Sequence, residues 1–299
     1  MAESACEYRK GRAMLYGTPY EHPDEISSHL DLVRSYSDLA PYLEFLKVQS
    51  EKTVEALKPI VNIRVGARDE ERVDVFPARQ PGAPIVIFIH GGWWHKNTRK
   101  LWNYAANGFW HHGYTVVVAD YALCPKVRIP DQTQACRAAV AWAYEHAVEV
   151  NGDPDQIFLV GHSAGGHLAA MMALTDWREE GLPANVLKGV APMSGIYDMH
   201  AIKACYIQTY VQLTVEAVIS QSPLFQIPEK APPMQIMVGD EESQEFHRQA
   251  SLFVDACRKK GLRTEYAVFP EEDHSTYVFD LCDPQSKTVK SIVDFFRTC

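Results

Sequence analysis

The stretch that decides the fold is residues 156–172, QIFLVGHSAGGHLAAMM. Its apolar run, residues 157–160, predicts a buried strand, and the small residues after Ser163 predict a helix. Between the two, the sequence has the G-x-S-x-G spacing, with Gly161 and Gly165 on either side of the serine. In that arrangement the serine stands on a strained strand-to-helix turn, and its flanking residues must be small enough for strand and helix to approach each other.

Strands and helices alternate on both sides of this turn. Strands are expected at residues 63–65, 73–76, 85–89, 115–119, 190–193, 234–238 and 264–269. Helices are expected at residues 100–111, 130–148, 243–260 and 284–296. Continuous apolar strands separated by helices of this length predict an α/β fold, with a mostly parallel central sheet covered by helices on both faces.

The chain has 299 residues, of which 46% are hydrophobic and 22% charged, as is ordinary for a globular protein. No internal repeat or linker divides it, so we expect one domain, residues 1–299. Within that domain, residues 1–60 are expected to form an extension over the core, with a short helix at Ser50–Leu57. Residues 194–228 are expected to form a short cap insertion.

Charge and cysteine content narrow the classes of partner. With 29 basic and 38 acidic residues the net charge is −9, which disfavours nucleic acid and anionic membranes and favours a small-molecule partner. Seven cysteines are scattered without a C-x-x-C spacing, and we interpret them as free thiols. The first residues lack the apolar core of a signal peptide, and no apolar run reaches the ~18 residues of a membrane span. A cytoplasmic location is therefore expected.

A serine hydroxyl needs a histidine to accept its proton and an acid to orient that histidine. The chain order serine, acid, histidine is the one expected for this type of turn. Ser163 is the predicted nucleophile, Asp240 the predicted acid and His274 the predicted base, because the last two lie just past the ends of successive apolar strands. Other acids remain open as alternatives, namely Asp198, Glu241, Glu242 and Asp273.

Acyl transfer also needs backbone N–H donors for the negative charge that develops on the carbonyl oxygen. The sequence His90-Gly91-Gly92-Trp93 follows an apolar strand, where glycines let main-chain N–H groups face a ligand. We expect Gly92, Trp93 and Ala164 to donate to the oxyanion, while Gly91 forms the turn. His90 is expected to order the loop and not to act as a ligand.

Aromatic residues near these loops are candidates for a substrate pocket, although core packing is the alternative for each of them. The candidates for substrate binding are Trp94, Tyr197 and Tyr206, with Trp93 and Tyr210 nearby. No metal site is expected, because the histidine pairs His90/His95 and His162/His167 lack the H-E-x-x-H pattern. The glycines match neither a phosphate loop nor a dinucleotide fold, so no cofactor is expected.

From about residue 60 onward the sequence resembles the α/β-hydrolase fold, and within it the kynurenine formamidase (arylformamidase) group. The motifs that carry the resemblance are HGGWW at 90–94, GHSAGGHL at 161–168, SGIYD at 194–198, SPL at 222–224 and GDEESQEF at 239–246. The related hormone-sensitive-lipase-like esterases usually have a third glycine in place of Trp93 and an acidic residue in place of His162. The resemblance places the group's triad on Ser163, Asp240 and His274.

We therefore expect a serine hydrolase that cleaves a small aryl formamide or ester through an acyl-enzyme, with N-formylkynurenine as the leading substrate. A general short-chain carboxylesterase is the alternative within the enzyme class. A non-catalytic receptor on a hydrolase scaffold is the alternative from another class, and the presence of all three triad candidates argues against it.

Overall fold

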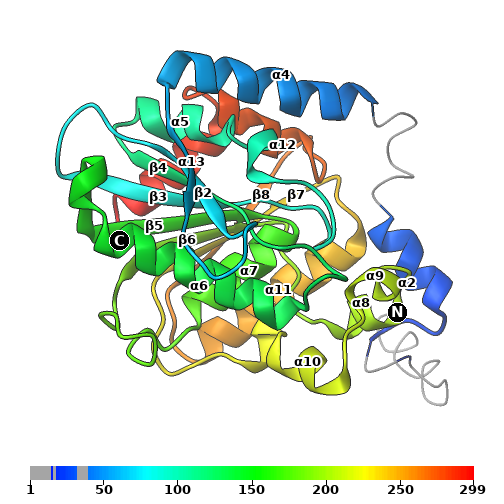
Figure 1. Ribbon diagram of the computed structural model, residues 1–299. Helices are drawn as coiled ribbons and strands as arrows, with labels where there is room; N and C mark the ends of the chain where they lie inside the picture. The colour runs from blue at the N-terminus through cyan, green and yellow to red at the C-terminus, as the bar shows by residue number, and fades with distance from the viewer. Residues whose placement is uncertain (1–14, 16–17, 32–39) are drawn as a thin grey trace.

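The computed structural model describes residue 15, residues 18–31 and residues 40–299. Within these residues the centre of the molecule is an eight-stranded sheet, which Figure 1 shows between two layers of helices. The order of strands across the sheet is β1-β2-β4-β3-β5-β6-β7-β8. The sequence pattern therefore predicted the fold class correctly.

The strands are β1 (Ile60–Arg64), β2 (Arg72–Phe76), β3 (Ala83–Ile89), β4 (Thr115–Ala119), β5 (Gly152–His162), β6 (Leu187–Met193), β7 (Met234–Gly239) and β8 (Thr264–Phe269). β2 pairs antiparallel with both β1 and β4. All the remaining pairs are parallel. The carboxyl ends of β3, β5, β6, β7 and β8 consequently lie along one edge of the sheet.

The continuous apolar strands are explained by burial on both faces of the sheet. Side chains of a strand alternate between its faces, so Ile85 and Ile87 enter one hydrophobic cluster while Val86 and Phe88 enter the other. Helices α6 (Ile129–Glu145), α7 (Ala164–Ala173) and α11 (Gln244–Lys259) cover the first face. Helices α5 (Ala105–His111) and α13 (Lys287–Phe296) cover the second (Figure 1).

The described part of the N-terminal 60 residues lies against this core. Helix α2 (Pro23–Leu30) contacts α11, and α4 (Ala40–Leu57) contacts α5. Because α4 begins at Ala40, the predicted helix at Ser50–Leu57 was too short. Pro41 stands in the first turn, where a proline has no intrahelical hydrogen bond to lose. The remainder of the expected extension, residues 1–14, 16–17 and 32–39, lies outside the described residues.

Short helices follow the carboxyl ends of the last strands. The segment expected to form a cap contains α8 (His200–Ala204), α9 (Gln208–Val211), α10 (Val215–Ser220) and the 3-10 turn η4 (Pro223–Phe225). Elsewhere there are α12 (Thr276–Phe279) and the 3-10 turns η2 (Arg99–Leu101), η3 (Val148–Val150) and η5 (Asp280–Cys282). Among the described helices, none is long and apolar enough to cross a membrane.

Candidate active site

Ser163 lies between the last residue of β5 and the first residue of α7. Its backbone has φ 59° and ψ −117°, a conformation that non-glycine residues rarely adopt and that tertiary contacts must maintain. Its N–H donates to the carbonyl of Met193 at 2.8 Å, and its own carbonyl accepts the N–H of His167 at 3.0 Å. These two bonds anchor the turn to β6 on one side and to α7 on the other.

The glycines of the motif allow the turn to pack tightly, as the sequence predicted. A Cβ at Gly161 would lie 2.1 Å from the carbonyl oxygen of Gly165. A Cβ at Gly165 would lie 2.1 Å from the carbonyl oxygen of Ile89, in the neighbouring strand β3. Both contacts are with backbone atoms, which cannot rotate away as a flexible side chain could, so only glycine fits either position.

His274 lies beside the serine turn and has an acidic partner, Glu242. Nδ1 of His274 donates to Oε2 of Glu242 at 2.7 Å, and both side chains are buried. The carbonyl of His274 accepts a hydrogen bond at 2.7 Å from Nε2 of His162, the residue before the serine. Nε2 of His274 is buried and has no hydrogen-bond partner within the described part of the chain. That nitrogen is therefore available to accept a proton.

Glu242 is itself held by several donors. Its Oε1 accepts the N–H of Gly239 at 2.8 Å and the hydroxyl of Ser194. The Ser194 oxygen in turn accepts the hydroxyl of Tyr277. Burial and then the charge of Glu242 raise the pKa of Tyr277 well above its ordinary value, so the phenol stays protonated as a donor. The carboxylate that orients His274 is thus fixed at both of its oxygens.

Asp240, the acid that the sequence favoured, does not contact His274. It is exposed, and its Oδ1 accepts the backbone N–H of Glu272 at 3.3 Å. The chain turns after β7, where the N–H of Glu242 bonds to the carbonyl of Gly239 at 3.3 Å. This turn directs Glu242 back into the site and leaves Asp240 facing solvent. The prediction of Asp240 as the partner of His274 is therefore corrected to Glu242.

The other acidic alternatives are also placed away from the imidazole. Asp198 accepts from Nδ1 of His200 at 2.7 Å, in the segment after β6. Asp273 accepts the N–H groups of Ser275 and Thr276 at the start of α12. Glu241 is exposed. Glu242 was among the alternatives that the sequence left open, but nothing in the local pattern distinguished it from its neighbours.

The loop after β3 carries two of the three predicted oxyanion donors. Gly92 has φ +122°, which favours glycine, and Trp93 has φ 50°. The carbonyl of Gly92 accepts the N–H groups of His95 and Lys96 at 3.1 and 2.9 Å, which curls the loop into a tight turn. Within residues 40–299, no backbone hydrogen bond uses the N–H of Gly92, Trp93 or Ala164.

Ala164, whose N–H is the third predicted donor, is the first residue of α7. The first N–H groups of a helix have no intrahelical acceptor and carry the positive end of the helix dipole. A Cβ at Gly91 would lie 3.0 Å from Cβ of Ser163, so the loop after β3 passes directly beside the predicted nucleophile. This contact brings the loop and the start of α7 to the same serine.

Two of the three predicted substrate-binding aromatics are core residues. Trp94 and Tyr197 are completely buried; the indole N–H of Trp94 donates to Nδ1 of His167 at 3.2 Å, and Tyr197 stacks on Phe253 with ring centroids 4.5 Å apart. The expectation that these two line a pocket is therefore wrong. Tyr206 is 37% exposed and remains available to a ligand.

Phe246 was not identified from the sequence, because nothing in its position on α11 distinguishes it from a core residue. Its ring lies 4.5 Å from that of His274 and 6.4 Å from that of Trp93, centroid to centroid. It therefore connects the histidine to the loop after β3. Ser194 could have been flagged, because it directly follows β6 at the same edge of the sheet as Ser163.

Two observations bear on other kinds of site. Among the residues that the structure describes, no group of three or more His, Cys, Asp or Glu side chains could hold a metal ion. A cavity of about 660 Å³ lies between α4 and the loop around Arg99, and neither the serine turn nor His274 lines it. The cavity is therefore separate from the residues that surround Ser163.

Comparison with known proteins shows which family and which relatives the chain matches. Residues 74–256 match the family model described as BD-FAE. Kynurenine formamidase of Danio rerio is 26% identical over 249 residues, which are 81% of this chain and 83% of the relative. Esterase LipQ of Mycobacterium tuberculosis is 28% identical over 228 residues, which are 70% of this chain and 53% of the relative.

Solved structures share the fold. The crystal structure of a protein from Silicibacter sp. tm1040, provisionally described as a thioesterase, aligns with a TM-score of 0.80 and 27% sequence identity. The alignment covers 90% of this chain and 99% of that protein.

The fold, the serine turn and the esterase-like relatives define the class: the protein is an α/β-hydrolase that acts on ester or amide bonds. More particularly, the chain belongs to the BD-FAE family, whose model matches more than half of its length, and it is similar to kynurenine formamidase.

Proposed function

We propose that the protein is a serine hydrolase that cleaves small aryl formamides or esters through an acyl-enzyme. Ser163 is the nucleophile, His274 the general base and Glu242 the acid that orients the histidine. The observation that carries the proposal is the 2.7 Å bond between Glu242 and Nδ1 of His274, which leaves Nε2 of that ring without a partner among the described residues. A carboxylate on Nδ1 fixes the tautomer whose Nε2 can accept a proton.

The reaction follows from these positions. Oγ of Ser163 attacks the carbonyl carbon while its proton passes to Nε2 of His274, and Glu242 stabilises the imidazolium that forms. The N–H groups of Gly92, Trp93 and Ala164 stabilise the negative oxygen of the tetrahedral intermediate. His274 returns the proton to the departing amine or alcohol, and water releases the acyl group from Ser163 by the same steps in reverse.

N-formylkynurenine is the leading substrate. It is an aryl formamide, so the acyl group on Ser163 would be a formyl group and the leaving group an aromatic amine. The relative named kynurenine formamidase supports this choice, because it aligns over most of both chains. Tyr206, the exposed member of the three aromatics predicted from the sequence, is a candidate contact for the aromatic ring.

A short-chain carboxylesterase is the second candidate function. It is supported by the similarity to esterase LipQ and to the Silicibacter protein provisionally described as a thioesterase. Esters and formamides place the same demands on the triad and the oxyanion donors. The two candidates therefore differ in the acyl and leaving-group pockets and not in mechanism.

The mechanism is tested with a fluorophosphonate probe, which forms a covalent adduct with an activated serine. The wild-type protein should be labelled at Ser163, as located by peptide mass spectrometry, and the Ser163→Ala variant should not. Ser275→Ala serves as the matched control, because it removes another buried serine hydroxyl while leaving the nucleophile in place. Failure to label Ser163 in the folded protein would exclude the mechanism and favour a non-catalytic receptor.

The substrate is tested by a panel that compares N-formylkynurenine, simpler aryl formamides and short acyl esters of 4-nitrophenol. A kcat/KM that is highest for the aryl formamides supports the first candidate. Labelling at Ser163 without hydrolysis of any formamide would leave the mechanism standing and select the carboxylesterase. Each substrate is run with Ser163→Ala to subtract uncatalysed hydrolysis.

We further propose that the protein works in a reducing compartment such as the cytoplasm. The six cysteines that the structure describes are all free thiols. Burial raises the pKa of Cys124 to about 11 and that of Cys257 to about 12, which keeps these two thiols protonated and unreactive.

A further inference from the structure

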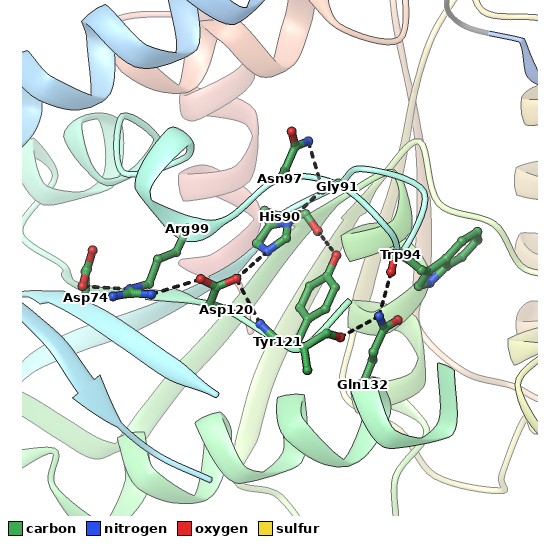
Figure 2. A network of polar contacts seen from close by, with 10 residues as sticks. Asp74, His90, Gly91, Trp94, Asn97, Arg99, Asp120, Tyr121 and Gln132 are labelled. Carbon is green, nitrogen blue, oxygen red and sulfur yellow. Dashed lines mark hydrogen bonds and ion pairs between the residues drawn. The ribbon is translucent and has the colours of Figure 1, made fainter. Parts of the chain in front are cut away.

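A chain of buried charged side chains lies behind the loop after β3 (Figure 2). Arg99 donates from Nε to Oδ1 of Asp74 at 2.9 Å and from Nη1 to Oδ2 of Asp120 at 3.0 Å. Oδ1 of Asp120 faces Nε2 of His90 at 3.1 Å. All four residues have exposed fractions of 7% or less. They come from β2, the end of β3, η2 and the end of β4, so only the folded sheet brings them together.

Both ring nitrogens of His90 face oxygen acceptors. Nε2 faces the Asp120 carboxylate, and Nδ1 lies 2.7 Å from the carbonyl oxygen of Gly91. A neutral imidazole can donate from one nitrogen only, whereas the doubly protonated ring donates from both. The doubly protonated ring also balances the buried charge, because Asp74, Asp120 and Arg99 alone would leave one uncompensated negative charge.

The bond from His90 to Gly91 sets the direction of an oxyanion donor. In a planar trans peptide, the carbonyl of Gly91 and the N–H of Gly92 point in opposite directions. The Gly91 carbonyl is held by Nδ1 of His90 and, at 3.3 Å, by Nδ2 of Asn97 (Figure 2). Holding this carbonyl behind the loop therefore aims the Gly92 N–H the other way, where no backbone acceptor within residues 40–299 takes it.

Gly92 needs this support because glycine itself does not fix the peptide. Its φ of +122° lies in a region that only glycine enters readily, and glycine has several other conformations within reach. An oxyanion donor contributes to catalysis only when it is already aimed at the place where charge develops. Side chains that hold this peptide in place therefore stabilise the transition state more than the bound substrate.

We propose that Asp120 and Arg99 are positioning residues for acyl transfer. They hold His90 in the state that donates from both nitrogens, and His90 aims the Gly92 N–H at the developing oxyanion. The inference rests on the proposed function, because it explains how the Gly92 N–H, an oxyanion donor of that reaction, is held in position. It gives a role in the reaction to two residues, Asp120 and Arg99, that contact neither the nucleophile nor the base.

The first test is Asp120→Asn, which keeps the size of the side chain and removes its charge. With 4-nitrophenyl acetate as the probe, kcat should fall by about 10- to 100-fold while KM changes by less than about threefold, because the lost alignment acts on the transition state. The rate of fluorophosphonate labelling at Ser163 should fall in parallel. A wild-type kcat in the folded variant would overturn the proposal.

Tyr121→Phe is the matched control. The Tyr121 hydroxyl donates to the carbonyl of His90 at 2.9 Å, and its ring stacks on His90 with centroids 4.4 Å apart (Figure 2). Phenylalanine keeps the stacking and loses one buried hydrogen bond to the same loop. That bond orients the N–H of Gly91, which is not an oxyanion donor, so kcat should stay unchanged. An equal loss of kcat in both variants would indicate general loosening of the loop and overturn the proposal.

The second test uses the wild-type protein and does not depend on the folding of Asp120→Asn. In a histidine-selective ¹⁵N NMR spectrum near neutral pH, the ring assigned to His90 by its absence from His90→Gln should have both nitrogens protonated. A neutral His90 ring would overturn the inference. If the proposed function itself were wrong, the result would be different: the wild-type protein would neither be labelled at Ser163 nor hydrolyse any member of the substrate panel.

Discussion

Oε2 of Glu242 lies 2.7 Å from Nδ1 of His274, and both groups are buried at the edge of the sheet where β7 and β8 end. The distance is that of a charge-assisted hydrogen bond. The relationship assigns the acid of the site to a residue two positions beyond the one that the strand end suggested. It also makes the role of Glu242 separable by mutation from that of Asp240.

The Glu242→Gln variant should lower kcat by a factor on the order of 10³ to 10⁴, with little change in KM. Glutamine keeps the size of the side chain, but its amide can donate to Nδ1 and so favour the tautomer whose Nε2 is already protonated. The measurement is steady-state kinetics with 4-nitrophenyl acetate. Asp240→Asn is the control and should retain near wild-type activity, since Asp240 is exposed. A large loss of kcat in Asp240→Asn together with near wild-type activity in Glu242→Gln would instead assign the role of the acid to Asp240.

Ser194→Ala should reduce kcat by about 10-fold and the free energy of unfolding by about 2 kcal/mol, because the buried carboxylate of Glu242 loses one of its donors. The remaining donor to the same oxygen is the N–H of Gly239 at 2.8 Å. Kinetics and urea unfolding measure the two effects. Tyr277→Phe is the graded control: its hydroxyl contacts Ser194 and not Glu242, so its effect on kcat should be smaller. A larger effect in Tyr277→Phe would contradict this arrangement.

Gly165→Ala should destabilise the protein by about 3 kcal/mol or more, although alanine is normally favoured over glycine in a helix. The cause is the Cβ position 2.1 Å from the backbone oxygen of Ile89. Gly82→Ala is the comparison, because that glycine has φ +72° and open space around it. There the cost should be the conformational strain alone, about 1 to 2 kcal/mol. If thermal or urea unfolding showed equal losses of stability in the two variants, the close contact with β3 would not be the cause of the loss in Gly165→Ala.

His167 should make the protein sensitive to mild acid. Burial lowers its pKa to about 4, and its Nε2 donates to the carbonyl of Gln221 at 2.7 Å. The unfolded chain takes up a proton near pH 6.5 and the folded protein does not, so this contribution to stability is present above that pH and is lost as the pH falls towards 4. Between pH 7 and pH 5 the loss from this group should be about 2 kcal/mol.

The His167→Gln variant tests this expectation, since glutamine does not titrate and its amide can both donate and accept. The free energy of unfolding in urea is measured at pH 7 and pH 5 for both proteins. The decrease should be smaller in the variant by about 2 kcal/mol. Identical decreases would mean that His167 is not responsible for the acid sensitivity.

The sequence alone determined the fold class and the serine turn, and it predicted His274 as the base. The serine turn can be identified from the sequence because the geometry of Gly161, Ser163 and Gly165 is local: a strand, a tight turn and a helix follow one another within a few residues. His274 was predicted because it lies just past the end of a strand, and parallel strands bring their carboxyl ends to one edge of the sheet. The loop after β3 was predicted as part of the site for the same reason.

Only the tertiary structure decided which acid faces His274 and which aromatics are buried. Asp240 and Glu242 follow the same strand, and the path of one turn determines which carboxylate points inward. The ion-pair chain through Arg99 joins residues that are distant in the sequence, so no local pattern could reveal it. The physical reason is common to these cases: spacing along the chain fixes where a backbone segment lies, but the direction and surroundings of a side chain depend on segments that pack against it from elsewhere in the fold.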